Sequence, residues 1–185
     1  GGPPPPLAGD VPADASPLIG LQVASFPTRP YRDWPIEQFE MLARNIRKRW
    51  SRSHFLIYGS ADDRTRTRWL KNQLADHATD YAGLSLRETA AIMQLTDLYV
   101  GVDTGPTHLM STFDIPLVGL YHCLSSSHHT GPLEHPCVYV IDHPHLGKNC
   151  TERSPMAEIT VDTVLAQVER ALTEHPPRDP SGRLP

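Results

Sequence analysis

A glycine-containing loop at residues 103–108 has the composition of an anion-binding site. It reads Asp-Thr-Gly-Pro-Thr-His and follows an apolar run that is typical of a buried strand. Gly105 lets the backbone approach a ligand closely, and Pro106 is tolerated in the first turn of a helix. Backbone amides at a helix start attract phosphate, so the pattern favours a phosphate site. The alternative is that Asp103 or Thr104 is an ordinary helix N-cap.

Histidine and cysteine concentrate in the second half of the chain. Seven of the ten histidines lie between His108 and His145, and the three cysteines are Cys123, Cys137 and Cys150. A metal site must therefore be weighed against a His-rich, partly exposed loop. The spacings contain no Cys-x-x-Cys pair and no His-Glu-x-x-His, so we predict neither a metal nor a cofactor. Three cysteines are too few, and odd in number, for a disulfide framework, which favours a reducing compartment.

Several other chemistries are excluded by their missing motifs. The sequence has no P-loop, no Gly-x-Gly-x-x-Gly after a strand and no Gly-x-Ser-x-Gly, which argues against NTPase, NAD-dependent and serine-hydrolase functions. The formal net charge is −4 and no stretch concentrates lysine or arginine, so we expect no nucleic-acid partner.

The elements that position the loop alternate between strand and helix. Apolar runs predict strands at 18–23, 54–58, 98–102, 117–121 and 138–141, and amphipathic spacing or capping residues predict helices at 36–50, 62–76, 85–95, 106–113 and 161–172. Continuous apolar strands that alternate with helices indicate an α/β fold, a Rossmann-like doubly wound parallel sheet. Ligands bind outside the carboxyl ends of such strands, so we expect the site in the loops that follow them.

Proline marks the ends of the predicted domain. Six of the 19 prolines lie in the first seventeen residues and four in the last ten. We therefore predict a Pro-rich linker at 1–17, a folded domain at 18–175 and a disordered tail at 176–185. No apolar run reaches the length of a transmembrane segment and no signal-peptide pattern opens the chain, so we expect a soluble, cytoplasmic protein.

The loop and its surroundings resemble the donor-binding half of family-nine glycosyltransferases, the heptosyltransferases of lipopolysaccharide core assembly. The similarity runs from about Leu18 to Leu172. Its segments, besides the loop itself, are Arg32-Asp33-Trp34-Pro35, Ser85-Leu86-Arg87-Glu88, Ile115-Pro116-Leu117-Val118-Gly119-Leu120-Tyr121 and Ile159-Thr160. The resemblance implies a GT-B architecture in which two Rossmann-like domains face each other. It also implies that this chain is half of such an enzyme.

Residue roles can be assigned from the resemblance, position by position. Asp103 would accept hydrogen bonds from the donor sugar, and the backbone of Thr104 and Gly105 would hold the pyrophosphate. The helix-start argument adds the amides of Gly105, Thr107 and His108, with Pro106 in the first turn. Ser25 matches a phosphate-contacting hydroxyl. Arg32 stands where the family has a phosphate-binding lysine, so the charge is kept and the geometry changes, and Arg29 is a second candidate for that task.

Three more positions have both a donor-binding and a structural interpretation. Asp63 matches a ribose-binding glutamate, although it, or Asp62 beside it, could instead favour a helix dipole. Leu84 matches an apolar position against adenine, or else is a core leucine at a helix entry. His122 lies where the family usually has Gly-Pro-Thr, and it would donate to phosphate or fill space.

The function implied is an inverting, metal-independent transfer from a nucleotide-sugar, with ADP-heptose as the donor, to a lipopolysaccharide-type or other glycan or lipid-linked acceptor. The catalytic base would belong to the N-terminal domain, outside this chain. The protein would act in the cytoplasm, at the inner face of the inner membrane. The alternative is a non-catalytic nucleotide-sugar-binding or interaction module with the same fold.

Overall fold

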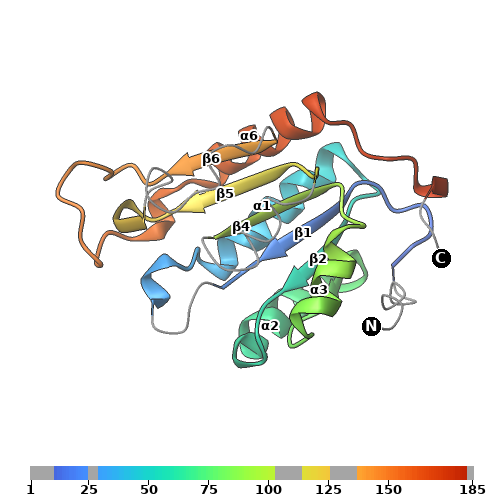
Figure 1. The fold of residues 1–185 in the computed structure, drawn as a ribbon, viewed down its shortest axis with the longest axis horizontal. Helices are drawn as coiled ribbons and strands as arrows, with labels where there is room; N and C mark the ends of the chain where they lie inside the picture. The colour runs from blue at the N-terminus through green and yellow to red at the C-terminus, as the bar shows by residue number, and fades with distance from the viewer. Residues whose placement is uncertain (1–10, 25–28, 103–113, 126–136, 183–185) are drawn as a thin grey trace.

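Parallel strands form one continuous sheet in the computed structural model, which describes residues 11–24, 29–102, 114–125 and 137–182 (Figure 1). In spatial order the six strands are β3 (Ala78–Asp80), β2 (His54–Tyr58), β1 (Leu18–Gln22), β4 (Leu98–Val102), β5 (Leu117–Tyr121) and β6 (Val138–Asp142). The four central strands are buried along their whole length, as a parallel sheet covered on both faces requires. The predicted Rossmann-like doubly wound sheet is confirmed.

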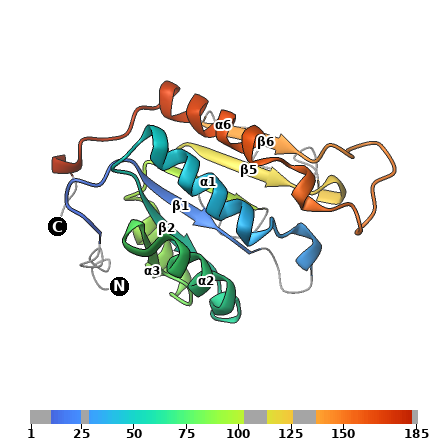
Figure 2. The same cartoon turned by 180° about the vertical axis from the view of Figure 1, so that it is seen from behind.

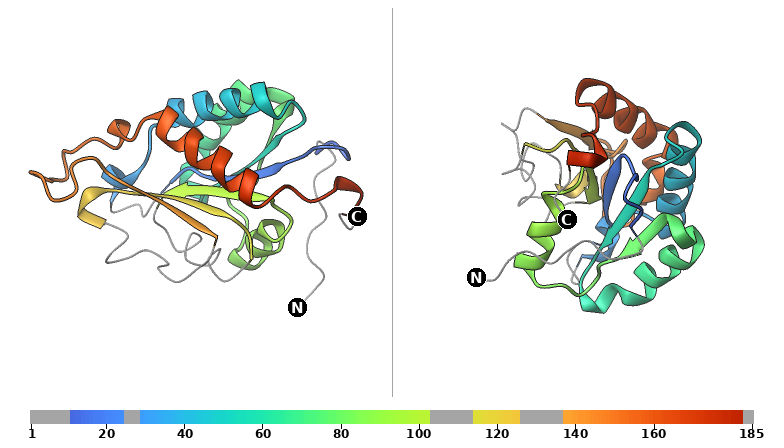
Figure 3. Two further views of the ribbon diagram at one scale, coloured as in Figure 1. Left: turned by 90° about the horizontal axis from the view of Figure 1, so that it is seen from above. Right: turned by 90° about the vertical axis from the view of Figure 1, so that its right-hand side faces the viewer.

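Helices cover both faces of the sheet (Figures 2 and 3). The helices α1 (Ile36–Arg49), α2 (Arg64–Leu74) and α6 (Val161–Glu174) lie on one face, and α3 (Leu86–Met93) lies on the other. The first face holds the larger core, which includes Phe39, Leu70 and Val168 from the three helices. The second core joins Ile92 and Met93 of α3 to apolar and tyrosine side chains of the strands.

Local sequence signals explain where these helices begin. Pro35 precedes α1, and the apolar spacing of that helix buries Phe39, Leu42, Ala43 and Ile46. The predicted capping box at α3 is present, because the Ser85 hydroxyl accepts the Glu88 amide and the Glu88 carboxylate accepts the Ser85 amide. The Thr160 side chain caps α6 by accepting the Thr163 amide.

The sequence prediction differs from the structure around β3. The expected helix at 62–76 is α2 with a 3-10 turn at each end, and residues 78–80, where no strand is predicted, form a short strand. Three residues carry too little periodicity to reveal a strand. Pairing with Phe55, Leu56 and Ile57 of β2 creates it. The predicted helix at 106–113 lies outside the described residues.

Both predicted end segments contact the domain where the structure describes them. In the Pro-rich segment Ala15 is buried, the Ser16 amide donates to Arg52 and Pro17 accepts the His54 amide. At the other end the Arg178 amide donates to the Asp97 carboxylate over 3.1 Å. Composition gave no sign of these contacts, and the division into linker, domain and tail stays a prediction. Among the described residues, none of the helices combines the length and hydropathy of a membrane-spanning helix.

Tyr139 on β6 makes the free energy of unfolding depend on pH in the alkaline range. Its hydroxyl donates to Glu174 over 2.7 Å, and burial, followed by that hydrogen bond, raises the pKa of Tyr139 from 10.0 to about 12. Because the folded-state pKa exceeds the unfolded value, this stabilisation is complete below pH 10 and lost as the pH rises toward 12. Between pH 10 and 12 the wild type should lose up to about 2 kcal/mol of unfolding free energy through Tyr139. Tyr139→Phe should not show this loss.

The measurement is urea denaturation of the wild type and of Tyr139→Phe, below pH 10 and near pH 12. Burial also raises the pKa of Tyr58, so the wild type loses stability from both tyrosines and only the difference between the two proteins reports Tyr139. Parallel pH profiles of the two proteins would contradict the assignment.

Candidate functional site at the carboxyl edge of the sheet

The loops at the carboxyl ends of the strands form the candidate site. The structure describes the segments after β1 from residue 29, after β2, after β3, after β5 to residue 125 and after β6. Ser25 and the whole predicted phosphate loop (Asp103, Thr104, Gly105, Pro106, Thr107 and His108) lie outside the described residues. The roles expected of these seven residues therefore stay predictions.

Arg32 is a buried cation in the segment after β1. A short 3-10 turn, Pro30–Arg32, carries it, and the side chain is only 7% exposed. Its guanidinium carbon lies 5.8 Å from the centre of the Tyr31 ring, which itself meets the His122 ring edge-on at 5.0 Å. Arg29, the other predicted phosphate ligand, is exposed before the turn. The structure thus brings Arg32 and His122 to one end of the sheet.

Arg66, which the sequence did not single out, holds this segment in place. From the first turn of α2 its guanidinium donates to the carbonyls of Val23 over 2.6 Å and Trp34 over 2.9 Å. It also pairs with Asp33 at 3.5 Å. A signal existed in the sequence, because a cation in the first turn opposes the helix dipole and so suggests a tertiary role. Arg66 fixes both ends of the backbone that carries Arg32.

Asp63 has a structural partner after β2. Its Oδ2 accepts the Ser60 amide over 2.8 Å and the Ser60 hydroxyl over 2.9 Å, which completes a capping box at the 3-10 turn Ala61–Asp63. Asp62 is exposed, and its amide donates to the Ser60 hydroxyl. Asp63 therefore has a structural role as a cap of this turn, and its binding of ribose stays a prediction.

Leu84 lies in the segment between β3 and α3. Its partly buried side chain packs against the smaller core, as do Tyr81 and Val138. The preceding Gly83 has a φ of +85°, and a Cβ there would lie 2.6 Å from the guanidinium of Arg64, so this turn requires glycine. The core interpretation of Leu84 holds in part, and its contact with adenine stays a prediction.

His122 uses both ring nitrogens within the chain. Its Nε2 lies 2.8 Å from the Ser154 carbonyl, and its Nδ1 accepts the Leu124 amide over 3.1 Å. These partners assign the neutral tautomer with the proton on Nε2. Burial lowers the pKa of His122, although the hydrogen bond to Ser154 opposes this, and His143 and Arg32 lower it further. Of its two expected roles, the geometry favours the structural one over donation to phosphate.

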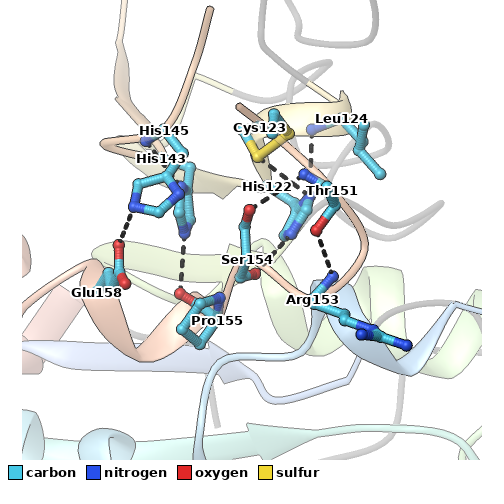
Figure 4. The surroundings of a disulfide bond; sticks show 11 residues. His122, Cys123, Leu124, His143, His145, Thr151, Arg153, Ser154, Pro155 and Glu158 are labelled. Carbon is cyan, nitrogen blue, oxygen red and sulfur yellow. Dashed lines mark hydrogen bonds and ion pairs between the residues drawn. A yellow bond between two sulfur atoms is a disulfide. The ribbon is translucent and has the colours of Figure 1, made fainter. Parts of the chain in front are cut away.

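His143 repeats the arrangement at the end of the neighbouring strand (Figure 4). Its Nε2 lies 2.8 Å from the Pro155 carbonyl and its Nδ1 accepts the His145 amide over 2.9 Å. The His122 and His143 rings are 5.3 Å apart. A histidine thus follows each of the adjacent strands β5 and β6. The two rings bind consecutive carbonyls, those of Ser154 and Pro155. His122 and His143 therefore have a structural role, because they hold residues 154–155 against the ends of β5 and β6.

Two of the three cysteines form a disulfide, although the sequence predicts no disulfide framework. Cys123 after β5 and Cys150 after β6 are joined, with Cα atoms 6.0 Å apart (Figure 4). Cys137 lies outside the bond, and its Sγ is 3.9 Å from His175 Nδ1. The pair is 27 residues apart in sequence, and the parallel pairing of β5 with β6 brings the two following loops together. An odd cysteine count excludes a complete framework, not a single bond.

A parallel sheet in the order 3-2-1-4-5-6 defines the fold as a Rossmann-like domain. The model of glycosyltransferase family 9 (heptosyltransferase) matches residues 11–159. The chain belongs to this family. A comparison with curated protein sequences gives no match.

Solved structures of the family have the same fold. ADP-heptose LPS heptosyltransferase II from E. coli aligns with a TM-score of 0.72 and 24% identity, over 85% of this chain and 47% of that one. A family 9 glycosyltransferase from Veillonella parvula gives 0.71 and 22% over 85% and 46%. The E. coli heptosyltransferase WaaC with ADP gives 0.71 and 21% over 87% and 46%. The chain spans about half the length of these structures.

Proposed function

We propose that this chain is a nucleotide-sugar-binding domain that places ADP-heptose at the carboxyl edge of its sheet for inverting transfer. The observation that carries the proposal is the burial of Arg32 at that edge, next to Tyr31 and His122, in a chain of family 9. A guanidinium binds phosphate oxygens through charge-assisted and often paired hydrogen bonds. The diphosphate of a nucleotide-sugar is an anion that Arg32 could bind in this way.

The chemistry assigned to this chain is stabilisation of the leaving group. As the acceptor hydroxyl attacks the anomeric carbon, the bond from that carbon to the diphosphate oxygen breaks and its electron pair stays on the phosphate. Arg32 then interacts with the growing negative charge. Arg66 holds the backbone on both sides of Arg32 before the reaction, and such preorganisation makes an electrostatic contact effective in the transition state. The acceptor proton passes to a base that we expect in the other domain.

The nucleoside half of the donor would lie toward β2 and β3. Asp63 would accept the ribose hydroxyls, and Leu84, beside Tyr81, would contact the base. ADP as the nucleotide is supported by the name of a similar structure, the WaaC enzyme with ADP. The lipopolysaccharide-type acceptor, and action in the cytoplasm at the inner membrane, rest on the family resemblance alone.

Calorimetric titration with ADP, UDP and GDP, and with ADP-heptose, tests the proposal. We expect the chain to prefer ADP and to bind ADP-heptose. Arg32→Ala should weaken ADP binding by about 10- to 100-fold, because a charge-assisted contact contributes about 1.5–3 kcal/mol. Arg32→Lys should fall between the two, since it keeps the charge and loses the planar fork.

Arg68→Ala is the matched control, because it removes an exposed arginine from the middle of α2. Thermal unfolding of each variant shows that the fold is retained. Asp103→Ala separates sugar from nucleotide, because it should weaken ADP-heptose binding and leave ADP binding unchanged. The donor-site proposal fails if no nucleotide binds at millimolar concentration, or if Arg32→Ala and Arg68→Ala behave alike.

The non-catalytic module is a separate outcome. Binding of ADP-heptose by a longer protein that contains this chain, without transfer to any glycan acceptor, would favour it. The replacement of the usual Gly-Pro-Thr by His122-Cys123-Leu124, a segment fastened by a disulfide and by the bonds of His122, is the observation in its favour.

A further inference from the structure

Three potential metal ligands meet at the ends of β5 and β6. His122 Nδ1 and the sulfurs of Cys123 and Cys150 all lie within 4.8 Å of one another (Figure 4). His122 is 1% exposed and Cys123 is 8% exposed, whereas Cys150 is partly exposed. In this structure the two sulfurs are bonded to each other, and a disulfide is a poor metal ligand because the thiolate is the ligating species.

Reduction changes the donor set from a disulfide to two thiols. A dithiol reductant supplies two electrons and two protons, the sulfur–sulfur bond breaks, and the reductant leaves as its own disulfide. When Zn²⁺ then binds, the two thiols release their protons and two thiolates and one imidazole face the ion. Thiolate and imidazole are the ligands that Zn²⁺ prefers.

The distances suit a tetrahedral zinc ion. With bonds of about 2.3 Å to sulfur and about 2.0 Å to nitrogen, neighbouring ligand atoms are about 3.6 Å apart. His122 Nδ1 and Cys123 Sγ are already 3.8 Å apart. The sulfurs must separate from bonding distance to this ligand spacing, and the Cα atoms that carry them are 6.0 Å apart. Three protein ligands leave one position for water.

The surroundings of His122 also match those of a metal ligand. The ring nitrogen that does not face the cysteines lies 2.8 Å from the Ser154 carbonyl, and metal-binding histidines usually orient themselves by such a hydrogen bond. One contact is lost, because Nδ1 now accepts the Leu124 amide. Leu124 is 45% exposed, so water can take over as the acceptor.

We propose that reduction of the Cys123–Cys150 disulfide creates a zinc site formed by His122, Cys123 and Cys150. The zinc ion then replaces the covalent bond as the connection between the loop after β5 and the loop after β6. This proposal does not depend on the donor-binding function.

A second group, His143, His145 and Glu158, serves as an internal comparison. It has no thiolate, and its members are bound to one another, since His143 accepts the His145 amide and His145 pairs with Glu158 at 2.6 Å. Zinc there would not require reduction of the disulfide. The two groups therefore make opposite predictions about redox dependence.

The test measures Zn²⁺ and Co²⁺ binding to the whole chain, reduced with a phosphine and then freed of it, or left oxidised. We expect one equivalent in the reduced protein and none in the oxidised protein. The Co²⁺ form should show the thiolate charge-transfer band and the visible bands of a tetrahedral ion. Cys123→Ser and Cys150→Ser should each weaken binding at least 100-fold. Cys137→Ser, the matched cysteine control, and His145→Ala should retain it.

Three results would overturn the proposal. These are equal binding by the oxidised and reduced chains, loss of binding in His145→Ala but not in Cys123→Ser, and a cobalt spectrum without a thiolate band. The spectrum of the reduced wild type decides the question even if a cysteine variant folds poorly. Circular dichroism of each variant identifies that case.

Discussion

Replacing Trp34 with alanine is expected to lower the free energy of unfolding by about 3–5 kcal/mol. Trp34 is fully buried in the larger core, and its ring meets that of Phe39 edge-on at 4.9 Å. Its indole nitrogen donates to the Ile159 carbonyl over 2.9 Å, which connects the segment after β1 to the turn before α6. Alanine would leave a cavity and remove one of the two donors to this carbonyl, which also accepts a hydrogen bond from Gln38 Nε2 over 3.0 Å.

Urea denaturation of the folded chain measures this effect. Trp34→Phe keeps much of the volume and loses the hydrogen bond, so we expect a smaller loss of about 1–2 kcal/mol. Trp69→Ala is the control, because that side chain is only partly buried against the same core. A Trp34→Ala loss no larger than that of Trp69→Ala would contradict the role assigned to Trp34.

Asp97→Ala is expected to cost about 2–4 kcal/mol of unfolding free energy. Asp97 is 7% exposed at the start of β4, and its Oδ2 accepts the Leu18 amide over 2.8 Å. Its Oδ1 accepts the Arg178 amide over 3.1 Å. Leu18 is fully buried, so alanine at position 97 would leave a buried amide without its acceptor.

Comparing Asp97→Ala with Arg178→Ala separates the effect of the Leu18 amide from that of the Arg178 guanidinium. The Arg178 guanidinium is 3.4 Å from the carboxylate and its side chain is 54% exposed, so its charge contributes little, about 1 kcal/mol or less. Asp97→Asn keeps an acceptor for Leu18 and should be intermediate. If Arg178→Ala costs as much as Asp97→Ala, the contacts of the Arg178 guanidinium dominate rather than the buried amide, and these include its hydrogen bonds to the Gln94 and Thr96 carbonyls.

Much of the fold was predictable because burial leaves a mark on the sequence. Strands covered on both faces must be apolar throughout, and the runs that end in Gln22, Tyr58, Val102 and Tyr121 were all recognised from that property. Helix starts were also predictable where a side chain caps the backbone, as Ser85 does. Arg32 was singled out by the resemblance of its segment to a family motif, and its role as a phosphate ligand stays a prediction.

The features that escaped prediction are created by contacts between distant segments. Strand β3 exists through its pairing with β2, and the Cys123–Cys150 bond through the adjacency of β5 and β6. Arg66 reaches carbonyls 43 and 32 residues away. The sequence shows that His122 and His143 are histidines, but no local pattern predicts their partners. The carbonyls that bind the two rings belong to Ser154 and Pro155, which are distant in the sequence.

The strand order has a consequence for how the two halves of a donor site are brought together. The chain winds outward from β1 through β2 to β3 and then returns to place β4 on the other side of β1, so these two strands form the topological switch point of the sheet. Gln22 pairs with Gly101 in the ladder, so the chain leaves both strands at the same level. Main-chain pairing thus sets the starting points of the segments that carry Arg32 and Asp103, whatever side chains those segments hold.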